Sequence, residues 1–285
     1  MKVITWNVQW FCGLDGIVDV ARVVNAARAM ADFDVICMQE VAVNYPLLEG
    51  DASHDQPALL KSLLPGFEVF FGAAVDELAP DGKSRQRFGN LIATRFPVAQ
   101  VHHYALPYPA AADTEGVRSM PRMCTSATVL TPLGHVRFMT THLEFYAPAM
   151  RMAQARELKR LHAHGCALAK FPPLLDESGG PFQHKPHTAH CILTGDFNFE
   201  PDAEEYALLQ APQTGASTLV DAWTCARPGE AHMPTFRLHD RRYGPVPITC
   251  DFLFVSETLT SRIKRIDVDL ETRASDHQPV LLELE

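Results

Sequence analysis

The sequence lacks a long apolar run, a paired-cysteine motif and a secretory leader. No apolar run approaches the ~18 residues that a membrane helix needs, so we predict no membrane span. The 7 cysteines are odd in number and scattered, and none has the Cys-x-x-Cys spacing typical of zinc or redox sites, which indicates reduced thiols in a core. Because Met1 and Lys2 lead directly into an apolar strand with no signal-like segment, we expect a cytoplasmic protein.

A surplus of positive charge is also missing. The 25 Lys and Arg residues against 34 Asp and Glu residues give a net charge of -9 at pH 7, and such a surface repels polyanions unless metal ions or local arginines intervene. This argues against a non-specific nucleic-acid binder. No repeat, low-complexity tract or linker divides the 285 residues, and the 47% hydrophobic content is ordinary for a globular core. We therefore predict one domain over residues 1–285.

The most informative stretch is Gly195-Asp196-Phe197-Asn198. It follows the apolar run 191–193, which predicts a buried strand, and Gly195 marks the point where the chain leaves the sheet. A carboxylate can hold a metal or orient a water, and an amide can donate to a phosphoryl oxygen without adding negative charge, so the pair suits phosphate chemistry. A simple turn is the alternative interpretation of the same residues.

Other polar side chains also stand where predicted strands end or begin. Read alone, each is typical of a solvated rim residue, a cap or a half-buried histidine; together they predict acids, amides and histidines that converge at one rim. Several carboxylates and an amide favour a hard cation such as Mg²⁺, with Mn²⁺ as a plausible substitute. These residues are Asn7 at the end of strand 3–8, Glu40 after strand 34–38, His142 at the end of hairpin strand 136–142, and Asp276 and His277 before strand 280–284.

The apolar stretch 248–256 predicts a strand, with Asp251 as a single carboxylate in its middle. An unpaired buried charge costs several kcal/mol, so Asp251 needs a partner, for which His277 is the candidate.

The remaining pattern predicts further strands, helices and loops. The loop at 104–120 carries Arg118, and long loops in compact domains are often functional. The loop at 171–189 is rich in histidine, but no Cys or acidic residue accompanies these histidines at zinc spacing. Arg241 and Arg242 could contact phosphate or simply aid solubility. Predicted helices span 16–31, about 57–64, 148–170 and 201–209; predicted strands span 67–75, 88–98 and 124–130; and a polar loop spans 79–87.

Seven blocks, in order along nearly the whole chain, resemble the endonuclease/exonuclease/phosphatase superfamily. The resemblance implies a deoxyribonuclease I-like four-layer α/β/β/α sandwich, with two mainly antiparallel or mixed sheets, and Mg²⁺-dependent cleavage of a phosphoester. The blocks are Thr5-Trp6-Asn7, Gln39-Glu40, Gly89-Asn90 through Arg95-Phe96-Pro97, Thr141-His142-Leu143, Gly195-Asp196-Phe197-Asn198, Asp251-Phe252 to Val255-Ser256, and Ser275-Asp276-His277.

The resemblance also implies roles for individual residues. Glu40 would be the main metal ligand, with Asn7 and Asp276 in or beside the coordination sphere. Asp196 would orient the attacking water and Asn198 would bind a phosphate oxygen. The remaining matches are Asp251 with His277, a carboxylate–imidazole pair that takes the water's proton or stabilises the pentacovalent state, and His142, which resembles a general acid or phosphate ligand.

The chain departs from the superfamily pattern in ways that bear on the substrate. Where abasic-site nucleases have a Tyr-x-Pro-Asn block, this chain has Thr141-His142-Leu143-Glu144. In deoxyribonuclease I the acid histidine pairs with a glutamate, and the nearest counterpart of that glutamate here is the uncharged Gln86. We therefore expect a small or accessible phosphoester, bound with help from Arg118, Arg122, Phe145 and Tyr146 and without an evident obligate protein partner. The alternatives are a DNA repair or degradative nuclease and an inactive binding module on the same fold.

Overall fold

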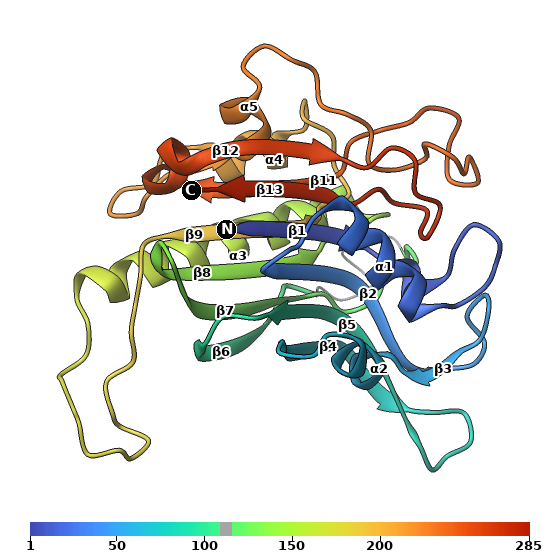
Figure 1. Ribbon diagram of the computed structural model, residues 1–285, viewed down its shortest axis with the longest axis horizontal. Coiled ribbons are helices and arrows are strands. Elements are labelled where there is room, and N and C mark those ends of the chain that lie inside the picture. The colour runs from blue at the N-terminus through green and yellow to red at the C-terminus, as the bar shows by residue number, and fades with distance from the viewer. Residues whose placement is uncertain (109–115) are drawn as a thin grey trace.

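Two β-sheets pack face to face, and helices cover their outer faces (Figure 1). The computed structural model describes residues 1–108 and 116–285. The first sheet has the order β12-β13-β1-β2-β5-β4, with β3 paired to β2, and the second has the order β10-β11-β9-β8-β7-β6. The strands are β1 (Lys2–Asn7), β2 (Val35–Tyr45), β3 (Ala52–Asp55), β4 (Glu68–Leu78), β5 (Arg85–Thr94), β6 (Val98–Ala105), β7 (Met123–Thr131), β8 (Gly134–His142), β9 (Cys191–Asp196), β10 (Leu219–Asp221), β11 (Asp251–Ser256), β12 (Ile263–Val268) and β13 (Val280–Leu284).

Three apolar cores hold the layers together. The first lies between the first sheet and the helices α1 and α2, the second between the two sheets, and the third between the second sheet and α3 and α4. This arrangement confirms the predicted four-layer sandwich. No helix within the described residues is both long and apolar enough to cross a membrane. The helices are α1 (Val20–Met30), α2 (Gln56–Leu63), α3 (Pro148–Lys170), α4 (Glu204–Gln210) and α5 (Ala222–Ala226), with the short 3₁₀ segments η1 (Gln9–Phe11) and η3 (Glu257–Arg262).

Each sheet is mostly antiparallel but has one parallel pair at its centre. β1 and β2 are parallel and are joined through α1, while β8 and β9 are parallel and are joined through α3. The register pairs Asn7 with Gln39 in one sheet and His142 with Asp196 in the other. Because parallel neighbours end at the same edge, these polar residues lie together at one rim of the sandwich, as the sequence predicted.

Two predicted strand boundaries are wrong. β2 does not end before Glu40 but continues to Tyr45, with a register shift between Met38 and Val41 in its pairing with β5. Glu40 lies inside this irregularity with a φ of 60°, so a local kink turns its side chain toward the rim while the strand goes on. Asp251 is the first residue of β11 rather than a residue in its middle.

Smaller differences concern loops and helix starts. The predicted loop 79–87 is shorter, since β5 begins at Arg85, and the predicted loop 104–120 begins after β6 ends at Ala105. Part of that loop, residues 109–115, lies outside the described residues. The helix predicted over 16–31 begins at Val20, because the Asp19 side chain accepts a hydrogen bond from the amide of Arg22 and caps it. Residues 172–190 form no helix or strand, in agreement with the predicted loop.

Candidate active site

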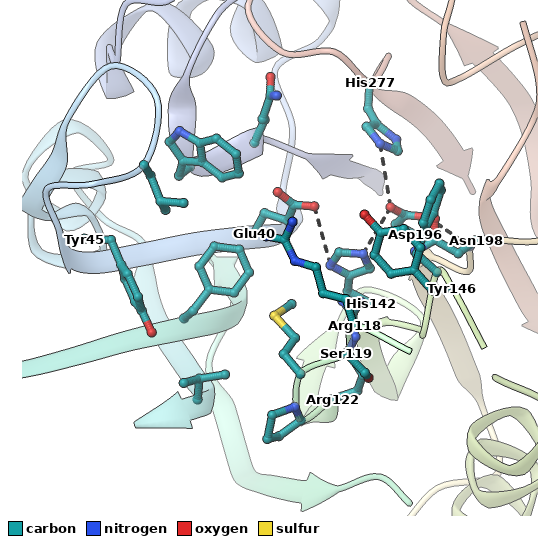
Figure 2. A pocket seen from close by; sticks show the side chains of 18 of the residues that line it. Glu40, Tyr45, Arg118, Ser119, Arg122, His142, Tyr146, Asp196, Asn198 and His277 are labelled. Carbon is teal, nitrogen blue, oxygen red and sulfur yellow. Dashed lines mark hydrogen bonds and ion pairs between the residues drawn. The ribbon is translucent and has the colours of Figure 1, made fainter. Parts of the chain in front are cut away.

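A cavity of about 670 Å³ opens at the rim where the central strands of both sheets end (Figure 2). Such a volume is typical of small-molecule sites. Among its lining residues are Glu40 from β2, His142 from β8 and Asp196 from β9. Of the strand-end residues singled out in the sequence, Glu40, His142, Asp196, Asp276 and His277 line this cavity.

Asn7 links the two sheets through two carboxylates that line this cavity. Its Nδ2 donates to Glu40 Oε1 at 3.1 Å and to Asp196 Oδ2 at 2.9 Å. Asn7 and Glu40 belong to the first sheet and Asp196 to the second, so one buried amide fixes the separation of two carboxylates. Charge-assisted bonds of this kind are stronger than neutral ones.

His142 lies between the same two carboxylates. Its Nδ1 is 3.8 Å from Glu40 Oε1 and its Nε2 is 3.5 Å from Asp196 Oδ2. Burial, aided by the positive charge of Arg122, lowers the pKa of His142 well below the ordinary value, so the imidazole is neutral at physiological pH. Gln86 is not its partner, because the Gln86 side chain donates to the carbonyl of Asn44 at 2.8 Å. A neutral ring favours a ligand or hydrogen-bonding role over that of a general acid.

His277 is held in the opposite protonation state. Its Nδ1 lies 2.9 Å from Asp251 Oδ2, and its Nε2 lies 3.7 Å from Asp196 Oδ2. Burial alone would lower the pKa of His277, but the charges of Asp251 and Asp196 raise it to about 10. The ring also stacks on Phe236, with centroids 4.2 Å apart. The predicted Asp251–His277 pair is therefore formed, and its imidazole is a cation.

Asp196 and Asn198 keep the geometry expected of an Asp-x-Asn turn. The amide of Asn198 donates to Asp196 Oδ1 at 3.0 Å, and Asn198 Nδ2 donates to the carbonyl of Leu143 at 2.9 Å. Asn198 has a φ of 53°, a left-handed conformation that asparagine tolerates better than most residues. Since an amide nitrogen carries two hydrogens, one N–H of Asn198 remains for a ligand in the cavity that the residue lines.

The acids of the site crowd one another. Burial raises the pKa of Asp196 and that of Asp276 to about 6 each, and burial also raises the pKa of Glu40. Neighbouring charges add to the effect, since Asp196 acts on Glu40 and Glu40 acts on Asp276. Ser275 Oγ is 3.4 Å from Asp276 Oδ1 and also donates to the carbonyl of Asn7 at 2.7 Å. Carboxylates concentrated in this way are stabilised by a cation.

The donor atoms fit the divalent ion that the family implies. Atoms of Glu40, His142 and Asp196 lie within 4.8 Å of one another, close enough to share one ion. The amide oxygen of Asn7 accepts a hydrogen bond from the backbone of Gln9, which leaves Glu40, Asp196 and Asp276 as the oxygen donors that Mg²⁺ or Mn²⁺ prefers.

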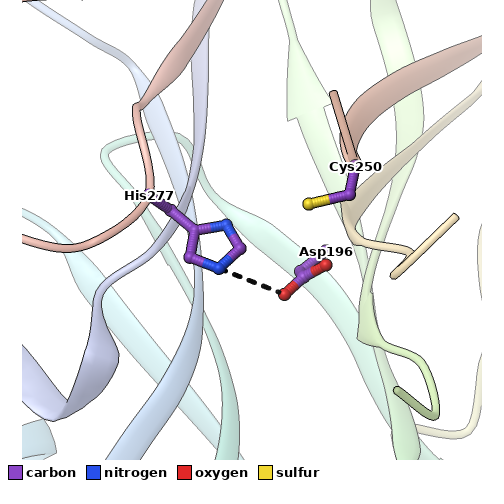
Figure 3. A group of neighbouring side chains, drawn as sticks. All are labelled: Asp196, Cys250 and His277. Atoms are coloured by element: carbon purple, nitrogen blue, oxygen red, sulfur yellow. Dashed lines mark ion pairs between the residues drawn. The ribbon is translucent and has the colours of Figure 1, made fainter. Parts of the chain in front are cut away.

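A second group, Asp196, Cys250 and His277, is also compact enough to hold an ion (Figure 3). Burial raises the pKa of Cys250 well above the ordinary thiol value, so the sulfur keeps its proton. The His277 imidazole is a cation and has no free lone pair. Metals bind thiolates and neutral imidazoles, so this group does not fit a metal centre.

The four residues predicted to bind substrate all line the cavity, but with different exposure. Arg122 is only 7% exposed and lies 3.8 Å from Glu144 through its Nε. Its Nε and Nη1 have no hydrogen-bond partner among the described residues. Arg118 is exposed, while Phe145 packs edge-on against Tyr146 with centroids 4.8 Å apart. Arg122 is thus the buried cation in reach of a phosphate.

Several cavity-lining residues were missed by sequence reasoning, among them the apolar residues of strands β2, β4 and β5 and the residues Gln9, Trp10, Phe236 and Tyr243. Phe236 and Tyr243 belong to segments without regular structure, which tertiary contacts bring to the rim. Of the four residues named, only the pair Gln9-Trp10 had a usable signal, because it follows the Asn7 block directly.

Other candidates have structural roles in the described part of the chain. His162, upstream of the histidine-rich loop, bonds Arg137 and the carbonyl of Ser217, and no loop histidine belongs to a group that could hold an ion. Arg242 forms ion pairs with Glu49 and Asp240, which favours a role in solubility over phosphate contact.

Comparison with known proteins decides the family. The model of the Endonuclease/Exonuclease/phosphatase family matches residues 4–277, nearly the whole chain. The chain belongs to this family. Membership supports a phosphoester-cleaving activity, and it confirms the resemblance on which the residue roles were based. No curated protein matches the chain.

Solved structures with the same fold cover all of this chain. A family member from Beutenbergia cavernae has 24% identity and a TM-score of 0.67, with 71% of its own length covered. A mannosyl-6-phosphatase from Bacteroides thetaiotaomicron has 19% identity, a TM-score of 0.66 and 99% of its length covered. D. rerio TDP2, in complex with a single-strand DNA product, has 18% identity, a TM-score of 0.65 and 98% of its length covered. Identities this low establish a shared fold only.

Proposed function

We propose that this protein is a Mg²⁺-dependent hydrolase that cleaves a phosphoester by attack of water. The observation that carries the proposal is the cluster at the rim: Asn7 bonded to both Glu40 and Asp196, with the cationic His277 3.7 Å from Asp196. Acids, an amide and a cation converge on a cavity, as hydrolysis of a dianionic or monoanionic phosphoester requires.

In this mechanism, Glu40 and Asp276 would hold the ion, and Asn7 would orient Glu40 through the hydrogen bond from its Nδ2. When bound, Mg²⁺ supplies Lewis-acid stabilisation of charge on the phosphoryl oxygens. The remaining N–H of Asn198 and the Arg122 guanidinium bind nonbridging oxygens. Neutral His142, between Glu40 and Asp196, orients the same group by hydrogen bonding.

Asp196 is the base of the reaction. With a pKa raised by burial to about 6, its carboxylate is more basic than an ordinary aspartate and remains ionised at neutral pH. It accepts a proton from the water while the water oxygen bonds to phosphorus and the bond to the ester oxygen breaks. Protonated His277 stabilises the charge that builds on the phosphoryl group, and the leaving alkoxide takes a proton from solvent.

Substitution of Asp196 tests the mechanism. Asp196→Asn keeps the shape of the side chain but removes the base, so we expect hydrolysis of p-nitrophenyl phosphate or bis-p-nitrophenyl phosphate in Mg²⁺ to fall roughly 10²- to 10⁴-fold. Asp202→Asn, a change in the nearby segment outside the cavity lining, is the control and should keep full activity. Undiminished turnover in the Asp196→Asn protein would rule out this role, provided both variants melt like the wild type.

The choice of substrate in the same assay distinguishes this hydrolase from a nuclease and from an inactive binding module. Hydrolysis of either small ester in Mg²⁺, but not in EDTA, supports the proposal and distinguishes diesters from monoesters. Cleavage confined to a fluorescent abasic-site duplex, with steep salt dependence, would instead indicate a nuclease. Tight binding without turnover of any ester would indicate an inactive binding module.

A further inference from the structure

The cavity does not end at the catalytic residues. It continues into an apolar arm lined by Trp10, Tyr45, Leu48, Val75, Phe88 and Met120. Most of these residues surround a small apolar cluster built on Ala42, Ala52 and Phe88. Figure 2 shows Tyr45 on the opposite side of the cavity from Asp196 and Asn198, with Glu40 and His142 between them.

The arm exists because β2 continues past Glu40. Ala42 pairs with Phe88 of β5, and Phe88 pairs in turn with Val75 of β4, so three strands form its floor. Tyr45 lies five residues beyond Glu40 on β2, at most roughly 16 Å along the strand at ~3.3 Å per residue. The arm is therefore long enough for an organic group attached to a phosphate held at Glu40.

Trp10 reaches the arm from an unusual backbone. Gln9, Trp10 and Phe11 have φ values of 44°, 45° and 62°, three consecutive left-handed residues without a glycine. Such a conformation costs about 1–2 kcal/mol per residue. It is held by Gln56, a fully buried side chain that donates to the carbonyl of Trp10 at 2.7 Å, and by Trp10 Nε1, which donates to the carbonyl of Glu49 at 2.8 Å. Strain maintained in this way is typical of functional positions.

Gln9 provides a second, independent observation. Its side chain lines the cavity and is only 4% exposed, yet its buried Oε1 has no hydrogen-bond partner in the part of the chain that the structure describes. Its backbone amide donates to Asn7 Oδ1 at 3.1 Å, which places Gln9 beside the catalytic cluster. A buried amide oxygen without a partner costs about 1–3 kcal/mol, an expense of the kind found at functional positions.

The positive charge of the cavity lies at its catalytic end. The two arginines that line it, Arg118 and Arg122, belong to the segment beside the catalytic cluster, and no Lys or Arg stands among the described residues of the arm. At the outer end, Tyr45 donates from its hydroxyl to Glu77 Oε1 at 3.0 Å. A polynucleotide carries a phosphate on every residue and needs cations along its whole track. One phosphate followed by an uncharged apolar group matches this distribution.

We propose that the apolar arm binds an aryl or alkyl group esterified to the phosphate, so that the substrate is a phosphoester of an apolar alcohol or phenol rather than a nucleic acid. This rests on the proposed function, because it places the phosphate at Glu40 and Asp196. Gln9 lies beside the phosphate end of the arm, and the walls of the arm exclude water from the apolar group.

Binding of non-hydrolysable phosphonates tests the arm separately from catalysis. The dissociation constants of methyl-, butyl-, hexyl- and phenylphosphonate are measured by calorimetry in Mg²⁺. Each buried CH₂ should tighten binding about fourfold, which gives up to roughly 60-fold from methyl to butyl. Leu48→Ala and Trp10→Ala should reduce this gain. Leu47→Ala is the matched control, because Leu47 is 88% exposed and does not line the cavity.

The outcomes separate the two proposals. Affinity that rises with chain length or with the phenyl group, and that falls in Leu48→Ala but not in Leu47→Ala, supports the arm; hexyl against phenyl then shows which class fits. Equal affinity across the series, an unchanged gain in Leu48→Ala, or tighter binding of a single-stranded oligonucleotide would overturn it. Graded binding without hydrolysis of any ester would leave the arm standing and remove the proposed function.

Discussion

Glu40 and Asn198 both reach the cavity from backbone conformations with positive φ, at 60° and 53°. Gln9 and Trp10 do the same, so four of the eight non-glycine residues with positive φ in the described chain line this cavity. Conformations of this kind cost about 1–3 kcal/mol each and persist where the surroundings over-determine them. The kink at Glu40, for example, is fixed on both sides by the pairing of β2 with β5. The site is thus assembled at some expense of stability.

At the scale of single residues, the charge of His277 depends on Asp251. In Asp251→Asn the anion 2.9 Å from His277 Nδ1 is lost, so burial dominates and the pKa of His277 falls from about 10. The cationic ring is present only below its pKa, and the alkaline limb of the rate profile should therefore move to lower pH. We expect hydrolysis at neutral pH to fall roughly 10²- to 10⁴-fold.

The rate profile of Asp251→Asn is compared with that of Asp267→Asn, in which a partly exposed carboxylate paired with Arg227 is changed far along the sheet. The control should keep the wild-type profile. An alkaline limb at the same pH in the Asp251→Asn protein would show that the imidazolium does not take part in the reaction.

At the scale of elements, replacement of a helix glycine by alanine usually stabilises a protein, but Gly165 in α3 should be an exception. A Cβ on Gly165 would lie 1.0 Å from Arg137 Nη1. That guanidinium donates through Nη2 to His162 Nδ1 at 3.0 Å and to the carbonyl of His162 at 3.1 Å. Gly165→Ala should gain ~1 kcal/mol of helix propensity but displace bonds to a charged group worth ~1.5–3 kcal/mol. We expect a net loss of about 1 kcal/mol in urea unfolding.

A double-mutant cycle isolates the cause of that loss. In the background of Arg137→Ala the space above Gly165 is free, so the same Gly165→Ala change should become neutral or stabilising. If Gly165→Ala stabilises the wild-type chain by the full helix propensity, Arg137 moves aside without cost. Its hydrogen bonds to His162 then contribute nothing to stability.

Sequence patterns predict where some of the strands end, but not all of them. Strands ending at Asn7, His142 and Asp196 were predictable, because an apolar run followed by polar residues marks the point where a chain leaves a sheet. The pattern fails at Glu40, because this polar residue predicts the end of a strand that continues to Tyr45. The apolar residues 41–43 after it were a signal that the strand continued, and missing them hid the apolar arm.

Some residues of the site lie in irregular segments, and the periodicity of the sequence could not predict their positions. Phe236 stacks on His277, and Tyr243 packs against Phe145 with centroids 6.4 Å apart, yet both aromatic residues lie in segments without regular structure. Their positions depend on long-range contacts such as the isolated bridges from Phe236 to Ile248 and His277. Short-range pattern carries no information on such contacts.

At the scale of the whole molecule, the net charge of -9 is partly concentrated at the active site, where burial raises the pKa of Asp196 and Asp276 to about 6. For acids whose folded pKa lies above the unfolded value, the folded state binds extra protons between about pH 4 and pH 6, and stability falls as pH rises through that window. Without a divalent ion, the folded protein at neutral pH must therefore hold these buried charges at a cost in stability, with His277 as a neighbouring cation.

A divalent ion should reverse that loss only where the carboxylates are ionised, because it binds the deprotonated groups. We expect Mg²⁺ at about 100 times its dissociation constant to raise the melting temperature over that in EDTA by roughly 5–10 °C at about pH 7.5, and by much less at about pH 5. Asp276→Asn should shrink the difference, whereas Asp267→Asn should not, since Asp267 pairs with Arg227 away from the cavity. An equal shift at both pH values would mean that the ion stabilises the protein through other groups, and the buried acids would then need a different explanation.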